Sequence, residues 1–191
     1  MEPAYKLLTV EDFLDSCPND QRHYQLFDGV MVAMAPPAIP HQIIAAALAL
    51  EIGLAVRAHL PGCSVRSQAG IAPHGVRGRD HFETDILVTC EPPSRGYRGI
   101  AEEPLLIVEV LSPSTDRDDV LTKLPAYQRV ASLREILYIE TERIGATVYR
   151  RNGGKWQTID LSGGQARLQL KTIGLDLPLG DIYRGVPGLS P

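Results

Sequence analysis

The chain has 191 residues, a formal net charge of −4 and a pI near 5.7. Hydrophobic residues make up 44% and charged residues 22%, which excludes wholesale disorder and provides enough apolar material for one core. The length predicts a single domain over residues 1–191. The acidic balance gives no whole-molecule attraction to nucleic acid.

The sequence shows no targeting segment and no cysteine framework. No window approaches the roughly 18 uninterrupted apolar residues that a membrane helix needs, and residues 1–6 lack the basic-then-apolar layout of a signal peptide. We therefore expect no membrane association and a cytoplasmic location. Cys17, Cys63 and Cys90 are widely spaced and form no Cys-x-x-Cys pair, so the pattern predicts free thiols rather than disulfides or a zinc site.

The first third of the chain predicts a short helix, a hairpin and a long helix. Thr9 followed by Asp12 is typical of a helix start. An Asp-Gly pair between two apolar runs predicts a tight hairpin, because Gly29 accepts the positive φ of the turn. Apolar residues then recur at three- or four-residue steps over 41–60, which predicts a helix that a Pro-Gly pair ends.

The rest of the chain predicts strands around one further helix. The run 105–111 is almost continuously apolar, which argues for a central strand. A helix over roughly 118–130 follows, and Pro125 inside it should kink or restart it at a cost of ~3 kcal/mol. Further strands are expected over 63–68, 84–89 and 135–140, then a C-terminal hairpin over 147–159 and an irregular tail.

Two acidic residues stand in otherwise apolar strands. Asp85 directly precedes the apolar run 86–88, and Glu109 interrupts the run 105–111. Burying a carboxylate is costly unless it is paired or bound to a metal. Each acid alone fits a strand end, where it is solvated or paired with an arginine. Two such acids on neighbouring strands favour a divalent-cation site, since Mg²⁺ commonly takes one or two carboxylates with waters and substrate phosphate.

Lys123 is the candidate positive partner of these acids. A lysine beside such a site adds positive charge to the transition state without being a ligand. The helix that follows the Glu109 strand can fold back over the sheet and bring Lys123 to it. On spacing alone, a solvated surface lysine is an equally good interpretation.

Several short motifs occur in one order along the chain. They are Tyr24-Gln25-Leu26-Phe27-Asp28-Gly29, Pro36-Pro37 with His41, Thr84-Asp85-Ile86-Leu87-Val88, Ile107-Val108-Glu109-Val110-Leu111-Ser112-Pro113-Ser114-Thr115, Lys123 with Tyr127, and Glu135-Ile136-Leu137-Tyr138-Ile139. Together they resemble the Uma-type family of proposed restriction endonucleases, within the PD-(D/E)XK nuclease superfamily. The resemblance covers roughly residues 8–183, and the motif around Glu109 is its most specific segment.

The resemblance implies a restriction-endonuclease-like α/β fold: a mixed central β-sheet flanked by α-helices, with an added C-terminal hairpin. It implies DNA as the substrate and Asp85 and Glu109 as ligands of Mg²⁺ or Mn²⁺. Leu111 occupies the place of the superfamily lysine, and Lys123 on the next helix takes over its role. Gln25 stands where the family usually has Glu, and its amide oxygen can still orient a water or a ligand without charge.

The resemblance leaves two functional hypotheses. The first is a metal-dependent endodeoxyribonuclease acting as a homodimer, since many such enzymes pair two active sites across a two-fold axis. The second is a weakened nuclease-fold module that binds nucleic acid or a protein partner without cleaving. Three features favour this second hypothesis: the net charge, Gln25, and Val30, which stands where the family usually has a second Glu. Thr84, where the family has Pro, costs rigidity more than chemistry. No base-reading motif names a target sequence.

The sequence indicates no catalytic role for two histidines. His41 is expected to act as a polar residue at a helix start, although its family position lies near the site. His81 and Glu83 are spaced like the start of a zinc deaminase motif, but no Pro-Cys-x-x-Cys follows, so we interpret them as coincidence.

Overall fold

The fold is described from a computed structural model, which describes residues 7–20, 22–92, 98–112 and 116–190. Its elements are α1 (Val10–Ser16), β1 (Tyr24–Phe27), β2 (Val30–Ala33), α2 (Ile39–His59), β3 (Ser64–Ile71), β4 (Phe82–Thr89), β5 (Ile100–Ala101), β6 (Pro104–Leu111), α3 (Asp116–Arg129), β7 (Glu135–Glu140), β8 (Gly145–Asn152), β9 (Lys155–Ser162), β10 (Arg167–Leu170), β11 (Leu175–Pro178) and the 3₁₀ helix η1 (Leu179–Tyr183).

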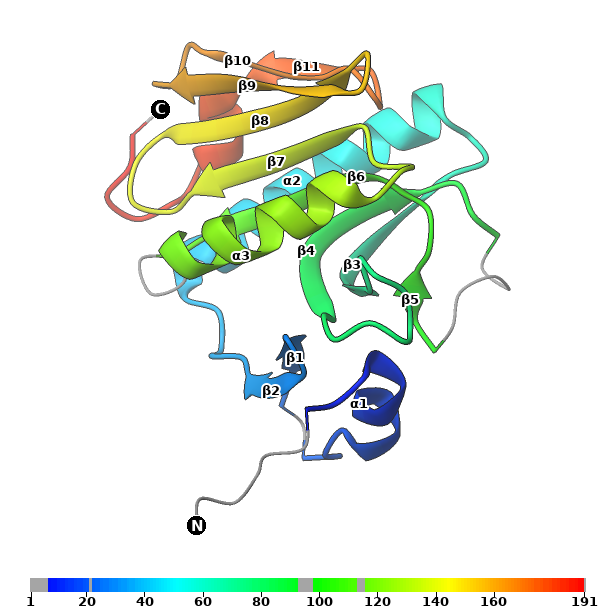
Figure 1. Ribbon diagram of the computed structural model, residues 1–191. Coiled ribbons are helices and arrows are strands. Elements are labelled where there is room, and N and C mark those ends of the chain that lie inside the picture. Colours follow the sequence, from blue (N-terminus) through cyan, green and yellow to red (C-terminus); the bar gives the residue numbers. More distant parts are fainter. Residues whose placement is uncertain (1–6, 21, 93–97, 113–115, 191) are drawn as a thin grey trace.

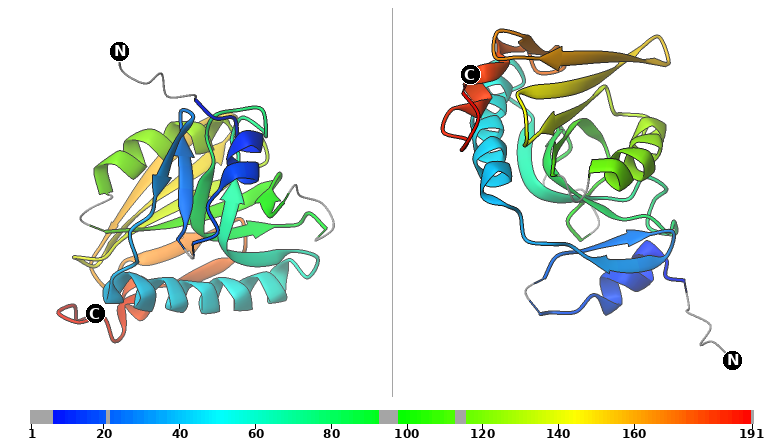
Figure 2. Two further views of the ribbon diagram at one scale, coloured as in Figure 1. Left: turned by 90° about the horizontal axis from the view of Figure 1, so that it is seen from below. Right: turned by 90° about the vertical axis from the view of Figure 1, so that its left-hand side faces the viewer.

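The centre of the molecule is a seven-stranded mixed sheet. Its strand order is β5-β3-β4-β6-β7-β8-β9. β6 and β7 run parallel, as do β3 and β5, and the other neighbours are antiparallel. α2 covers one face of the sheet and α3 the other (Figure 1, Figure 2). This confirms the predicted class, a mixed central sheet flanked by helices.

The core lies on both faces of β6. On the α2 side, Ile44, Leu48 and Ile52 pack in one buried cluster with inward residues of the sheet. On the α3 side, Tyr127 packs in a second cluster with Ile107 and other residues of the opposite face. Seven of the eight residues of β6 are buried, as expected for the continuous apolar run of a central strand.

α2 is long and apolar enough to cross a membrane when judged by length and composition alone. Its most apolar 18-residue window has a mean hydropathy of 1.7, with 28% of that window buried. The core helix of a globular protein passes the same test. The buried residues of α2 pack against the sheet, so this helix forms one layer of the fold.

An N-terminal unit of α1 and the β1–β2 hairpin lies at one end of the sheet (Figure 1). α1 begins with the predicted cap: the Thr9 side chain accepts a hydrogen bond from the Asp12 N–H, and the Asp12 side chain accepts one from the Thr9 N–H. Gly29 turns the hairpin with a φ of 81°, and an added Cβ would lie 2.8 Å from that of Leu7. An isolated bridge between Leu26 and His81 joins β1 to the start of β4.

The C-terminal region is more ordered than the sequence indicates. The expected hairpin forms β8 and β9, which extend the central sheet to its edge. The tail, expected to be irregular, contains β10, β11 and η1, so that expectation is wrong. Its residues alternate between buried leucines and exposed polar residues, and the leucines cover the α2 face of the sheet.

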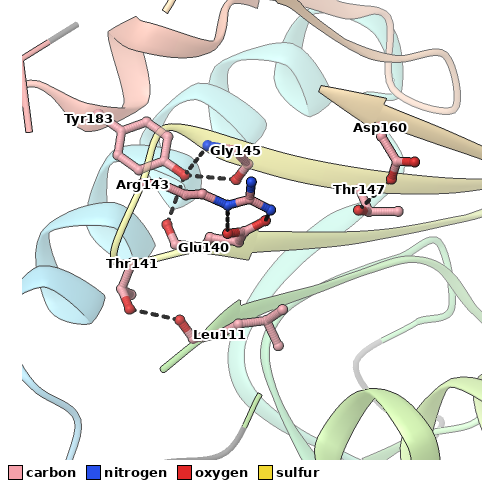
Figure 3. Close-up of polar contacts among 8 residues, drawn as sticks. All are labelled: Leu111, Glu140, Thr141, Arg143, Gly145, Thr147, Asp160 and Tyr183. Carbon is pink, nitrogen blue, oxygen red and sulfur yellow. Dashed lines mark hydrogen bonds and ion pairs between the residues drawn. The ribbon is translucent and has the colours of Figure 1, made fainter. Parts of the chain in front are cut away.

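Tyr183 of η1 fixes this C-terminal layer to the β7–β8 turn (Figure 3). Its hydroxyl lies 2.7 Å from the Glu140 carbonyl and 2.8 Å from the Gly145 carbonyl, and it accepts from the Gly145 N–H at 3.2 Å. Beside it, the Thr141 hydroxyl donates to the Leu111 carbonyl at 2.8 Å. That bond fixes the end of β6, two residues beyond Glu109.

Cys63 and Cys90 form a disulfide, which corrects the expectation of free thiols. β3 and β4 pair with Ser64 opposite Thr89, so the two cysteines that flank this pair come opposite each other. Their pairing follows from strand register, which the spacing of cysteines in the sequence does not reveal. Cys17 is a free cysteine.

Pro125 does not break its helix. α3 continues from Asp116 to Arg129 with Pro125 inside it, contrary to the expected restart. The ring lies on the exposed side of the helix, where water can satisfy the carbonyl that loses its partner. The opposite side of α3 therefore keeps a continuous surface toward the sheet.

Candidate functional site

Asp85 lies at a break in the hydrogen-bonded ladder. β4 pairs with β6 as far as Ile86 and Val108, and with β3 it pairs on both sides of Asp85 but not at Asp85 itself. Gln68, which faces this break from β3, has a φ of 52°, a strained value for a residue other than glycine. The Asp85 carboxylate uses the freed space, because its Oδ2 accepts a 2.7 Å hydrogen bond from the Val110 N–H.

Glu109 lies on the neighbouring strand, one residue before the Val110 N–H that donates to Asp85. In the β4–β6 register the last paired residues at this end are Ile86 and Val108. The next position on each strand is an acid, so Asp85 and Glu109 lie where the two strands separate. Glu109 is only 4% exposed. Its Oε1 accepts a 2.6 Å hydrogen bond from the Tyr127 hydroxyl. The structure therefore brings the two predicted acids to one place.

Lys123 reaches the same acid from α3. Its Nζ lies 3.5 Å from Oε1 of Glu109, and the residue is 1% exposed. Lys123 and Tyr127 are one helical turn apart, so both project from the same side of α3 toward the sheet. A buried carboxylate and a buried ammonium are each costly alone and stabilise each other when paired. The surface-lysine interpretation is therefore wrong, while a catalytic role for Lys123 stays a prediction.

His41 contacts Asp85, although the sequence predicted only a polar residue at a helix start. Its Nε2 lies 3.2 Å from Oδ1 of Asp85. Burial lowers the pKa of His41, but the hydrogen bond to Asp85 and the charges of Asp85 and Glu109 outweigh burial and leave the pKa raised. The residue before α2 is Ala38, and no side chain caps the helix. His41 thus serves the acidic pair rather than the start of its helix.

Gln25 is a buried residue of the hairpin strand β1. It shares a face of β1 with Phe27, whose ring lies 5.1 Å from that of Phe82, which in turn lies 5.7 Å from that of Tyr127. Gln25 is 6% exposed, and its Oε1 has no hydrogen-bond partner among the residues that the structure describes. A buried carbonyl oxygen without a partner is costly, which is typical of an acceptor held ready for a ligand or a water.

Glu83 is a further acid beside the pair, and the sequence interpretation treated it as coincidence. It lies two residues before Asp85 on β4. Burial raises the pKa of its carboxyl; contact with His23 lowers it, the charge of Asp85 raises it and that of Lys123 lowers it. Glu83 is therefore close enough to the site for two of its charged residues to act on it.

The donor set fits a hard divalent cation. Asp85 and Glu109 offer carboxylate oxygens, and Gln25 offers an unpartnered amide oxygen from the adjacent hairpin. Within the described ranges, no group of three or more His, Cys, Asp or Glu residues is arranged to hold a metal ion. A magnesium ion needs only one or two carboxylates when waters and a substrate phosphate complete its shell. The set matches that mode and not an all-protein cage.

Comparison with known proteins places the chain among nuclease-like sequences. Residues 10–180 match the Uma2 family, described as "Putative restriction endonuclease". An uncharacterized protein of Synechocystis sp. (strain PCC 6803) is 29% identical over 182 residues, which cover 94% of this chain and 93% of that protein. Restriction-endonuclease-like enzymes generally depend on a metal ion, and this agrees with the oxygen donors described above.

A solved structure shares the fold. The crystal structure of a "putative nuclease" of the DUF820 family from Anabaena variabilis superimposes with a TM-score of 0.75. The match covers 93% of this chain and 98% of that one at 16% sequence identity. At this identity the likeness establishes the arrangement of strands and helices, and the roles of individual residues rest on the geometry above.

Proposed function

The chain belongs to the Uma2 family, and on that basis we propose that it is a metal-dependent endonuclease that hydrolyses DNA phosphodiester bonds. Asp85 and Glu109 hold Mg²⁺ or Mn²⁺ in this proposal. The observation that supports it is that Asp85 accepts a hydrogen bond from the backbone beside Glu109, at a break in the sheet, while the buried ammonium of Lys123 lies against Glu109. The ion, when bound, polarises the phosphate and promotes attack by water.

The residues of this chain supply the remaining chemistry. Lys123 offsets the repulsion between the two carboxylates and stabilises the negative charge that develops on the phosphoryl group. Tyr127 holds Oε1 of Glu109, and His41 holds Oδ1 of Asp85, so that both carboxylates are oriented in advance. Gln25 orients a water or a ligand through its unpartnered oxygen.

We further propose that the enzyme acts as a homodimer, which allows two sites to cut both strands of a duplex. Light scattering at several protein concentrations tests this. If the measured mass is that of one chain even at the highest concentration, the dimer is contradicted and the assignment of the site is unaffected.

A nuclease assay tests the proposed function directly. Supercoiled, linear duplex and single-stranded DNA are each incubated with the protein and Mg²⁺ or Mn²⁺, alongside Asp85→Asn and Glu109→Gln. We expect cleavage by the wild type only with metal, and loss of it in both variants. Calorimetry with each metal in the absence of DNA gives a second readout. Equal cleavage by wild type and variants would show a contaminating nuclease and contradict the proposal.

The alternative function is a module that binds nucleic acid or a protein partner without cleaving it. Gln25 in place of the usual acid and Val30, which is 51% exposed on the hairpin, favour this alternative. Such a module has no need of a metal. Absence of both metal affinity and cleavage, with DNA binding retained, would select it over the enzyme.

A further inference from the structure

Hydrolysis of a phosphodiester needs a group that removes a proton from the attacking water. The side chain of Lys123 is 2% exposed and lies against Glu109, so its ammonium is enclosed between helix and sheet. Each oxygen of Asp85 already accepts a hydrogen bond or an ion-pair contact within the protein. A solvent-accessible proton acceptor beside these residues must come from another element.

His23 and Glu83 form such a pair at the edge of the site. The Nδ1 of His23 lies 2.7 Å from Oε1 and 3.0 Å from Oε2 of Glu83. Glu83 comes from β4, two residues before Asp85, and strand geometry places their Cα atoms about 7 Å apart. His23 immediately precedes β1, whose Leu26 bridges to His81 at the start of β4. The hairpin therefore carries His23 to the same end of the sheet as the acidic pair.

The contact with Glu83 decides which nitrogen of His23 can act as a base. A carboxylate accepts hydrogen bonds, so Nδ1 must carry the proton that points to it. In the neutral ring the lone pair is then on Nε2. No residue in the described part of the chain bonds to Nε2, and the His23 side chain is 53% exposed against 12% for Glu83. The largely buried acid thus orients an imidazole that is about half exposed to solvent.

We propose that His23, oriented by Glu83, is the general base of the hydrolysis, an inference that rests on the proposed function. Nε2 takes a proton from water while the water oxygen bonds to phosphorus. The bond from phosphorus to the leaving sugar oxygen breaks, and that oxygen takes a proton from solvent. Glu83 stabilises the imidazolium, which then returns its proton to solvent. Water and one diester give one monoester and one alcohol.

A purely structural role for the pair makes a different prediction. An ion pair with one exposed partner is worth about 0–1 kcal/mol and would only tie the chain before β1 to β4. Removing it would lower stability slightly, and no added small molecule would restore function. A base, by contrast, can be replaced by free imidazole once the side chain has left a space for it.

His23→Ala and Glu83→Gln are the test variants, assayed for DNA cleavage with and without added imidazole. His74→Ala is the matched control, because His74 is also a partly exposed histidine beside a carboxylate, 3.7 Å from Asp80. General bases contribute about 10²–10⁴-fold, so we expect a loss of that order in His23→Ala. Imidazole should restore a large part of it. His74→Ala should cleave like the wild type, with or without imidazole.

Two further readouts separate the base from a positioning or folding effect. Metal affinity by calorimetry and the thermal midpoint of His23→Ala should match the wild type. Nitrogen NMR of the wild type should show the Nδ1-protonated ring of His23, and Glu83→Gln should shift the tautomer ratio. Full activity in His23→Ala, or lost activity that imidazole does not restore, would overturn the assignment of His23 as the general base. A wild type inactive with every metal would refute the proposed function, and the base with it.

Discussion

The hydroxyl of Tyr127 donates a 2.6 Å hydrogen bond to Oε1 of Glu109, the same oxygen that Lys123 approaches at 3.5 Å. Both donors come from one side of α3 and converge on one carboxylate oxygen from the strand beneath. The ring of Tyr127 is fully buried and packs edge-on against Phe82 at 5.7 Å, so the hydroxyl has little freedom to move. The orientation of Glu109 is therefore fixed by helix packing.

Tyr127→Phe should weaken metal binding and cleavage by about 10–100-fold, the range that loss of an outer partner of a metal ligand typically produces. The ring and its packing are retained, while the bond that orients Glu109 is lost. Calorimetric titration with Mn²⁺ and the rate of DNA cleavage measure the effect. Tyr149→Phe is the control, because Tyr149 lies on β8, which β7 separates from the strand of Glu109. Equal effects of both variants would contradict a specific role for Tyr127.

Lys123→Ala should abolish cleavage while leaving metal binding largely intact, because the ammonium is a charge partner and not a ligand. Without Lys123, Glu109 stays buried but loses the positive charge that helps to offset the cost of burying it. We therefore also expect the free energy of unfolding to fall by about 3–5 kcal/mol, as when one partner of a buried ion pair is removed. Denaturant unfolding without metal measures this.

Lys155→Ala is the matched control for Lys123, since Lys155 is exposed at the start of β9. It should change neither cleavage nor unfolding. If Lys123→Ala folds with wild-type stability and still cleaves, the ammonium has no part in either process and the binding-module function gains support.

Patterns local in sequence were sufficient to predict the main elements. Glu109 stood out because one charge interrupted an apolar strand, and a buried central strand tolerates such a charge only with compensation. The helix carrying Lys123 was predicted from its apolar spacing. Lys123 was expected to reach the two acids, and Pro125 argued against this because it indicated a break that the helix does not show.

Contacts that depend on strand register were not predictable from one sequence. His41 is 44 positions before Asp85, and only the packing of α2 beside β4 brings them together. Glu83 and His23 meet because the hairpin bridges to the start of β4. Such distant contacts leave no periodic signal in the sequence. The C-terminal strands were missed for a related reason, since their short alternating segments gain stability only against the core.

Protonation of His81 should destabilise the fold in mild acid. Burial lowers its pKa from 6.5 to about 4. The unfolded chain therefore binds this proton between those values while the folded protein does not, so stability falls as the pH falls from 6.5 and levels off below about 4. The total loss from this group is up to ~3 kcal/mol. Denaturant unfolding at a series of pH values measures the slope.

His81→Asn should remove this part of the pH dependence, because asparagine does not titrate. The ring of His81 packs 5.0 Å from that of Phe13, so the variant also loses some stability at neutral pH, and the slope between pH 6.5 and 4 is the informative quantity. His59→Asn, at the exposed end of α2, serves as the control and should keep the slope. An unchanged slope in His81→Asn would refute the assignment.

Reduction of the Cys63–Cys90 disulfide should lower stability without altering the site. The bond spans 27 positions of sequence, and closing a loop of that size stabilises a protein by roughly 3 kcal/mol through the unfolded chain. β3 and β4 are already paired beside it, and Asp85 lies five residues from Cys90, so the acidic pair should keep its geometry. Cys63→Ser with Cys90→Ser should therefore unfold at a lower temperature than the wild type while binding metal equally well. Cys17→Ser is the control and should unfold like the wild type.

Thiol titration in denaturant should find one free thiol per chain before reduction and three after it. Three thiols before reduction would show that the bond does not form in the isolated protein.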